Sequence, residues 1–317
     1  MSKFVAFTNS VPLAVVTRSG VQDALHRGSA VVVDAAGTVL DEVGERGTRA
    51  YIRSAAKPIQ CIPVITSGAA DTFGLDDADI AIISGSHAGG DDQVSQVQSI
   101  LRKCGIDEDR LESGTGIRDN CSGKHVGMLA VCRQLGYPLA GYADPTHPHQ
   151  QTIIETLMAI CHLGDDELHV GVDGCSAPIH YFSIEKMARG YARMSMPDQH
   201  FGGQTAGAIR RITAAMAEHA GGHTGEPPYH EVLGDDVRLL TKAGGNGVYC
   251  AAVVDHGIGF AMKVEGGDRE PLRPVFTRMM RRLGLVSEEQ ATEIERRFWP
   301  PVENRRGQKV GSIELLI

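Results

Sequence analysis

The chain has 317 residues, of which 42% are hydrophobic and 22% charged, the ordinary balance of a soluble globular protein. Its formal net charge of −8 argues against sequence-independent nucleic-acid binding, which depends on clustered Lys and Arg. No apolar run reaches the ~18 residues that a membrane helix needs. We therefore expect neither a nucleic-acid partner nor a membrane partner.

Two features predict the compartment. The N-terminal segment has no basic stretch followed by a long apolar core and a small-residue cleavage site. Seven cysteines, an odd number, are spread from Cys61 to Cys250 in a chain large enough to fold without disulfides. Both features predict a cytoplasmic protein with free thiols.

No repeat, low-complexity tract or Pro/Ser-rich linker interrupts the chain, so we expect a single domain over 1–317, with two lobes at most. Residues 29–37 and 38–45 predict a β-hairpin near the start. A helix is expected over 54–67, with Ser54 at its N-terminus. Pro63 requires a kink in that helix or an earlier end.

A second helix is expected over 91–104, capped by Asp91 or Asp92 and ended by Gly105. Further helices are predicted over 124–135, 148–162, 184–195, 203–219, 270–283 and 288–298. Strands are predicted at 79–84, 168–172 and 311–316 and, as an antiparallel hairpin, at 247–254 with 258–264. Hairpins near both ends with helices between them favour an α+β fold over a repeating βαβ unit.

The first candidate for chemistry is an S-x-x-K motif, Ser54 to Lys57. If Ser54 begins a helix, Lys57 projects one turn later from the same face and can take the serine proton. The amine must be neutral to do so, which requires burial or a second cation nearby. By itself the motif fits a helix cap followed by an exposed lysine equally well.

The second candidate is the small-residue loop S-G-S-H-A-G-G, with Ser86 and His87, which follows an apolar run. Its hydroxyls, imidazole and free backbone N–H groups suit a catalytic position. By itself the loop also fits a glycine-rich turn in which His87 is merely hydrogen-bonded.

The third candidate is a pair of cysteine-containing turns, N-C-S-G-K-H at 120–125 and D-G-C-S-A-P at 173–178. Cys121 and Cys175 could share a Zn²⁺, completed by His125 or Lys124, although their spacing is not that of a zinc finger. Three other cysteines fall on apolar helix faces and are expected in the core: Cys104, Cys132 and Cys161.

The fourth candidate is Lys242 in T-K-A-G-G-N-G, just before a predicted strand. A lysine at a strand edge beside flexible glycines can bind a carboxylate or tune a neighbouring base. By itself it also fits a loop lysine in solvent.

Taken together and in order, these segments resemble the Rhizobium etli-type L-asparaginases, a thermolabile class with a Ser–Lys active site. The resemblance spans residues 26–268. It is carried by HRGSAVVVDAAGTVL, RSAAKPIQ, SGSHAG, NCSGKHVGML, HPHQ, GVDGCSAP, TKAGGNGVY and GFAMKVEGGD.

The resemblance implies the fold of serine β-lactamases and glutaminases, an antiparallel sheet flanked by helices with a helical lobe. It implies an L-asparaginase that hydrolyses L-asparagine to L-aspartate and ammonia through an acyl-enzyme, and a homodimer. The implied catalytic residues are Ser54 with Lys57 and Ser86 with Lys242. The implied substrate-binding residues are Arg53, His87, Asn120, His125, Asp173 and Gly244. The implied zinc ligands are Cys121, Lys124 and Cys175.

The sequence also departs from that family. Ala88 and Ala243 replace expected hydroxyls, and the segment between His87 and Asn120 is short, so substrate preference stays open. The alternatives are an amidohydrolase for L-glutamine or a similar small amide, and a non-catalytic zinc- or ligand-binding module. A penicillin-recognising peptidase shares S-x-x-K, but it would require an export signal.

Overall fold

Strand β2 (Val21–Asp34) is the longest strand of the computed structural model, which describes residues 9–317. Its first half pairs with β1 (Val11–Arg18), and its second half lies between β3 (Val39–Val43) and β9 (Ile258–Val264). The predicted hairpin near the start is therefore confirmed as β2 and β3. All these pairings are antiparallel.

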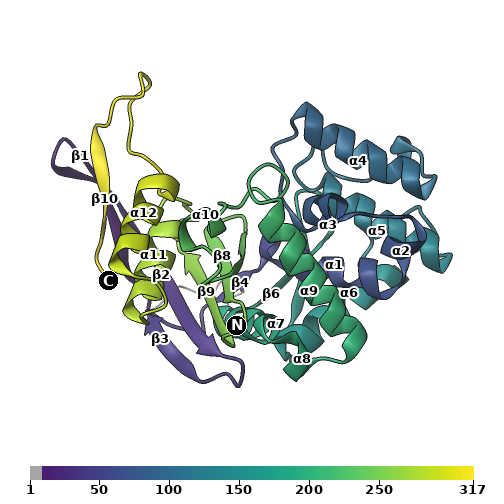
Figure 1. Cartoon of the computed structure of the whole chain (residues 1–317), viewed down its shortest axis with the longest axis horizontal. Helices are drawn as coiled ribbons and strands as arrows, with labels where there is room; N and C mark the ends of the chain where they lie inside the picture. Colours follow the sequence, from purple (N-terminus) through teal and green to yellow (C-terminus); the bar gives the residue numbers. More distant parts are fainter. Residues whose placement is uncertain (1–8) are drawn as a thin grey trace, which may run out of the picture.

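The remaining strands complete a seven-stranded sheet in the order β10-β1-β2-β9-β8-β7, with β3 attached to β2. The strands added here are β10 (Gly311–Leu315), β8 (Val248–Val253) and β7 (Leu239–Ala243). A three-stranded sheet joins β4 (Arg49–Tyr51), β6 (Pro178–Ser183) and β5 (His169–Val172). Figure 1 shows the large sheet on one side of the molecule and most helices on the other.

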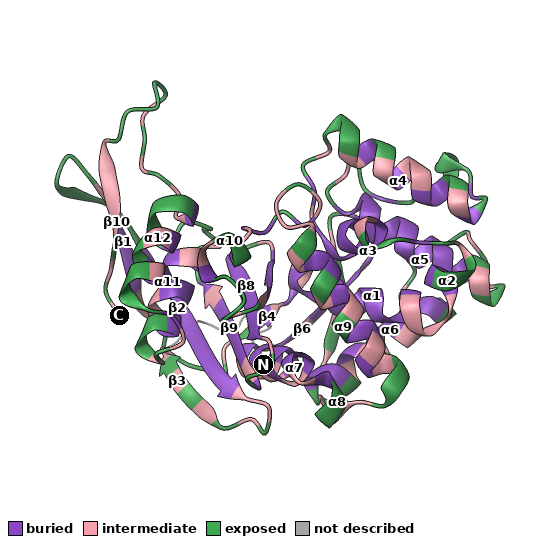
Figure 2. Cartoon of the chain, in the orientation of Figure 1, coloured by how far each residue is buried: buried purple, intermediate pink, exposed green. Residues whose placement is uncertain are grey.

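Successive side chains of a strand point to opposite faces of the sheet, and here both faces carry apolar side chains against which helices pack. In β2, Val31 and Val33 belong to the core shared with the helices, whereas Ala30 and Val32 belong to a second core on the opposite face. Helix α7 (Ile184–Ser195) covers the first face, and α11 (Leu272–Arg282) with α12 (Glu288–Phe298) covers the second. Figure 2 shows the resulting buried strands.

The approach of α7 to the sheet depends on a glycine. A side chain at Gly259 of β9 would overlap the carbonyl oxygen of Ala188 and the amide of Ala192 in α7. Only a residue without Cβ lets the helix backbone lie this close to the strand.

The helical part is built around α1 (Lys57–Thr66), which follows a 3₁₀ turn at Arg53–Ala56 and packs against α3, α5, α6 and α9. The bounds of the other helices are α2 (Ala69–Thr72), α3 (Asp77–Ser84), α4 (Asp91–Cys104), α5 (Ser122–Leu135), α6 (Pro148–Cys161), α8 (Pro197–His200), α9 (Gly203–Glu218) and α10 (His230–Leu233). These helices and the antiparallel sheet confirm the predicted α+β class. The single domain stays a prediction.

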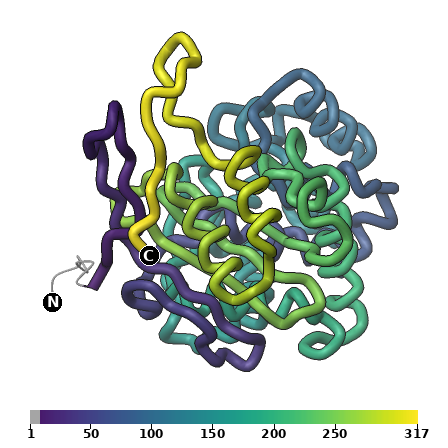
Figure 3. Tube along the Cα trace, turned by 60° about the vertical axis from the view of Figure 1, so that its left-hand side comes forward, coloured from purple at the N-terminus to yellow at the C-terminus, as the bar shows by residue number. Residues whose placement is uncertain are grey.

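The two ends of the described chain meet at one edge of the large sheet. Strand β10 pairs with β1, and the amide of Ser19 donates to the carbonyl of Val310 beyond the paired strands. Figure 3 shows the N-terminal hairpin and the C-terminal segment side by side. None of the helices within residues 9–317 combines the length and apolar character needed to cross a bilayer.

The predicted strand at 79–84 is wrong: this segment is helix α3. Asp76 caps the helix, because its Oδ1 accepts from the amide of Asp79 while Asp79 Oδ2 accepts from the amide of Asp76. The following apolar run is buried because helices α1, α5 and α9 pack around it. A short apolar run bears the same pattern in a buried helix as in a buried strand.

Smaller corrections concern helix ends. Gly90, not Asp91 or Asp92, is the N-cap of α4, and Gln93 Oε1 accepts from the Gly90 amide. Helix α1 does not end early at Pro63 but continues to Thr66. The left-handed Gly105 ends α4 as predicted.

Candidate active site

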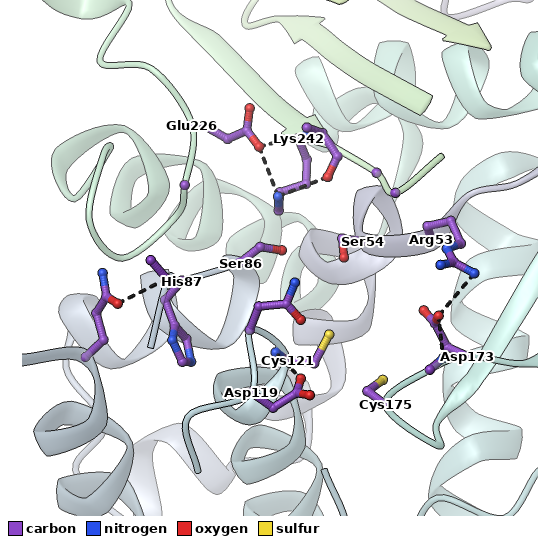
Figure 4. Close-up of a pocket in the computed structure, with 18 of the residues that line it drawn as sticks. Arg53, Ser54, Ser86, His87, Asp119, Cys121, Asp173, Cys175, Glu226 and Lys242 are labelled. Atoms are coloured by element: carbon purple, nitrogen blue, oxygen red, sulfur yellow. Dashed lines mark hydrogen bonds and ion pairs between the residues drawn. The ribbon is translucent and has the colours of Figure 1, made fainter. Parts of the chain in front are cut away.

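A cavity of about 560 Å³ lies where the helices meet the β7 end of the large sheet (Figure 4). It brings together predicted site residues from segments far apart in the chain. These are Arg53, Ser54, Ser86, His87, Asn120, Cys121, Asp173, Cys175, Lys242 and Gly244. A small recess behind Ser54 is lined by Lys57 and Lys124.

His125 is the exception among the predicted residues, because it lines neither the cavity nor the recess. It is fully buried on α5, where its Nδ1 lies 2.7 Å from the hydroxyl of Tyr142. That position places it within the helical core instead of against a substrate.

Ser54 lies in the 3₁₀ turn that leads into α1, and it is half-buried at the cavity wall. Arg53 before it has a φ of 54°, a left-handed conformation that costs a non-glycine residue about 1–2 kcal/mol. The Arg53 guanidinium is held by Asp173, with Nη1 and Oδ1 3.2 Å apart. This ion pair ties the Ser54 turn to the Cys175 turn.

Lys57 is buried, with a relative exposure of 1%, so the alternative of an exposed lysine after a helix cap is wrong. Its Nζ donates to the Gly85 carbonyl at 2.7 Å and to the Asn120 carbonyl at 3.0 Å, and lies 2.9 Å from Ser86 Oγ. Burial lowers the pKa of Lys57 to about 8, and the positive charges of Lys242 and Lys124 act in the same direction. The amine is thus closer to neutrality at pH 7 than an ordinary lysine.

The Ser86 loop begins directly after α3 and is held by His87. The Gly89 amide donates to His87 Nδ1, so Nε2 carries the proton and donates to Ser122 Oγ at 2.9 Å. Burial, aided by the charge of Lys57, lowers the pKa of His87 to about 4. His87 is therefore neutral at pH 7 and fixes the loop beside the cavity, which agrees with the hydrogen-bonded alternative.

Lys242 lies on β7, opposite Cys250 of β8, and is 1% exposed, so the alternative of a solvated loop lysine is wrong. Its Nζ donates to Glu226 Oε1 at 2.9 Å and to the Ala243 carbonyl at 3.1 Å. The resemblance paired Lys242 with Ser86, whereas the hydrogen bond to Ser86 in this structure comes from Lys57.

The two cysteine turns meet at the floor of the cavity. Cys121 and Cys175 both line the cavity here, and Lys124 Nζ donates to Cys175 Sγ at 3.2 Å. The neighbouring Cys175 sulfur, with the charges of Lys57 and Lys124, lowers the pKa of Cys121. Burial disfavours the charged form of Lys124, but the sulfur atoms of Cys121 and Cys175 favour it more strongly. The pKa of Lys124 is therefore raised.

This donor set is chemically suited to a soft cation. Two sulfur atoms and a buried amine could bind Zn²⁺ once the metal displaces their protons. Within residues 9–317, no three His, Cys, Asp or Glu side chains form a metal-binding group, and the predicted set differs because one ligand is a lysine. The other predicted core cysteines, Cys104, Cys132 and Cys161, are buried as free thiols.

Two acidic residues that line the cavity were missed by the sequence analysis, Glu226 and Asp119. Glu226 follows the glycine-rich segment 221–225, and an acid beside such a loop was the available signal. Asp119 Oδ1 accepts from the Cys121 amide at 2.8 Å and so shapes the first cysteine turn. Its position directly before the N-C-S-G-K-H motif was the corresponding signal.

The sequence of this chain matches a known protein family over nearly its whole length. Residues 14–315 match the family described as L-asparaginase II. The chain belongs to the L-asparaginase II family. No curated protein sequence matches this family member.

Solved structures similar to this L-asparaginase II family member are distant in sequence. Mglu in its native form is 14% identical with a TM-score of 0.47, over 82% of this chain and 65% of Mglu. A β-lactamase from Mycobacterium bovis is 12% identical with a TM-score of 0.45, over 80% of this chain and 94% of that one. A Bacillus glutaminase is 13% identical with a TM-score of 0.40, over 81% and 91%. The chain spans less than two thirds of the Mglu chain.

Proposed function

We propose that this L-asparaginase II family member is an amidohydrolase that converts L-asparagine to L-aspartate and ammonia. The observation that carries the proposal is the buried Lys57 amine, hydrogen-bonded to Ser86 Oγ at 2.9 Å in the cavity that Ser54 also lines. A hydroxyl next to a desolvated amine is an activated-nucleophile arrangement. Family membership supplies the choice of an amide substrate.

In the proposed reaction, Ser54 Oγ attacks the side-chain amide carbon and gives up its proton towards Lys57. Backbone N–H groups at the start of the Ser54 turn stabilise the oxyanion. The C–N bond breaks as the leaving nitrogen takes the proton back from Lys57, which releases ammonia. Water then attacks the acyl-enzyme, its proton passes to the same base, and L-aspartate and the free Ser54 hydroxyl are formed.

The hydrogen bonds of Lys57 support a proton path through Ser86. A neutral lysine has two N–H donors and one lone pair. The carbonyl oxygens of Gly85 and Asn120 can only accept, so they take the two donors and leave the lone pair for the Ser86 hydroxyl. Ser86 would then pass its proton to Lys57 as it receives the proton of Ser54, and Figure 4 shows its hydroxyl directed towards Ser54.

Ammonia release by the purified protein tests the reaction. We expect L-asparagine to release ammonia faster than L-glutamine, because the family to which the chain belongs is described as L-asparaginase II. A rate on L-glutamine equal to or above that on L-asparagine would replace the substrate assignment. No release from either amide would overturn the amidohydrolase proposal.

We also propose that Cys121, Lys124 and Cys175 hold Zn²⁺, as the resemblance implies and as their donor atoms allow. When bound, the metal would supply a fixed positive charge that orients substrate. A homodimer is proposed on the family resemblance, and sedimentation of the 33.9 kDa chain tests it. A cytoplasmic location is proposed on the seven cysteines, which the structure holds as free thiols.

Replacement of Cys175 by Ser is expected to lower bound zinc from about one atom per chain to less than about 0.2, because a hydroxyl is a far weaker zinc ligand than a thiolate. Elemental analysis after dialysis measures this directly. Cys161→Ser is the matched control, since Cys161 is a buried cysteine on α6 outside the cavity. Equal zinc in wild type and Cys175→Ser would remove Cys175 from the ligand set.

A further inference from the structure

Lys242 and Glu226, which both line the cavity, form a buried ion pair. The two side chains have relative exposures of 1% and 5%, and Nζ lies 2.9 Å from Oε1. The same Oε1 accepts from the Ala243 amide at 2.8 Å. A buried ammonium and carboxylate this close stabilise each other's charge. Lys242 therefore serves as a fixed cation and not as a free base for Ser86.

The orientation of this cation leaves one donor for a ligand. Glu226 Oε1 and the Ala243 carbonyl take two of the three N–H groups of Lys242. Both side chains line the cavity, and Figure 4 shows Glu226 on the side of Lys242 away from Ser54. Arg53, the other paired cation of the cavity wall, is less buried, and its guanidinium also has a carboxylate, Asp173, as counter-ion.

The segment that carries Glu226 also holds the Ser86 loop. The Ser86 amide donates to the Thr224 carbonyl at 3.0 Å. Gly225 lies so close to the Ser86 carbonyl that a Cβ there would overlap it. One short segment thus holds both Lys242 and Ser86 at fixed positions in the cavity wall.

We propose that Glu226 is a positioning residue that holds Lys242 as the recognition group for the α-carboxylate of the substrate. This inference rests on the proposed function. The substrate has one anionic group, and a charge-assisted hydrogen bond to it from the buried Lys242 ammonium is stronger than one made in water. Glu226 acts through Lys242 and does not contact the substrate.

Three amides separate this role from a general structural one. L-Asparagine carries both α-substituents, succinamate keeps the carboxylate and lacks the ammonium, and 3-aminopropanamide keeps the amine and lacks the carboxylate. We expect Glu226→Gln to raise KM about 10-fold and Glu226→Ala about 100-fold for the first two, with kcat changed less than about 3-fold. The Gln variant is the milder one because its amide oxygen still accepts from Lys242 and Ala243.

For 3-aminopropanamide we expect kcat/KM to stay within about 3-fold of wild type in both variants. Glu231→Gln is the matched control, since Glu231 lies on α10 and forms an exposed ion pair with Arg297 of α12. An equal loss on all three amides, or no loss on any, would overturn the inference while leaving the amidohydrolase proposal intact. A wild-type enzyme that releases ammonia from none of them would overturn both.

Discussion

Replacement of Ser54 by Ala is expected to lower kcat for ammonia release from L-asparagine by at least about 10³-fold. The reason is that the acyl group has no oxygen to which it can transfer once this hydroxyl is lost. The fold should tolerate the change, because neither the 3₁₀ turn nor α1 is capped by a side chain here. We expect the free energy of unfolding to change by no more than about 0.5 kcal/mol.

Ser67→Ala is the matched control, because Ser67 ends the same helix and accepts from the Ala69 amide away from the cavity. It should keep wild-type kcat. Near-normal kcat in Ser54→Ala would exclude Ser54 as the nucleophile. If Ser86→Ala were inactive in that case, the nucleophile would be the hydroxyl that Lys57 contacts directly.

Replacement of Lys57 by Met is expected to lower kcat by about 10²- to 10⁴-fold, the range for loss of a general base. Met has nearly the same length but no nitrogen, so Ser86 loses its proton acceptor at 2.9 Å. Lys57→Arg should be inactive to the same degree, because a guanidinium stays protonated and cannot act as a base. Single-turnover rates on L-asparagine measure the chemical step.

Stability must be followed in the same Lys57 variants. Lys57→Met leaves the carbonyls of Gly85 and Asn120 without their donor, at a cost of about 1–3 kcal/mol each, and removes a desolvated amine, which offsets part of that cost. Thermal unfolding should therefore still show a cooperative transition. Lys186→Met, in a partly exposed ion pair with Glu167, is the control for losing a lysine. A folded Lys57→Met enzyme within about 3-fold of wild-type kcat would refute the role of Lys57 as base.

Elements with strong local signals were predictable. Helix α12 and strand β9 have the predicted bounds, 288–298 and 258–264. Helix α12 carries its own start signal, because Ser287 and Gln290 form a capping box. Strand β9 forms the predicted hairpin with β8, because a short turn lets adjacent segments pair without a long loop closure.

Elements whose identity depends on distant neighbours were not predictable. Strand β7 was missed because Thr241 and Lys242 give it a polar character, which is stable only because Glu226 lies behind it. Strand β6 was missed because it begins at Pro178 and contains the fully buried His180. In each strand, burial by other segments of the chain overrides the low intrinsic β-propensity of the residues.

By itself the sequence determined the residue types of the site, because short motifs keep Ser54, Lys57, Ser86 and the two cysteine turns within local segments. Only the tertiary structure decided which of them meet. Lys57 reaches Ser86, 29 positions away, and Lys242 reaches Glu226, 16 positions away. The hydrogen bonds and buried charges that give these groups their chemistry are made between segments. Their formation depends on how α3, β7 and the segment 221–226 pack together, which no local pattern records.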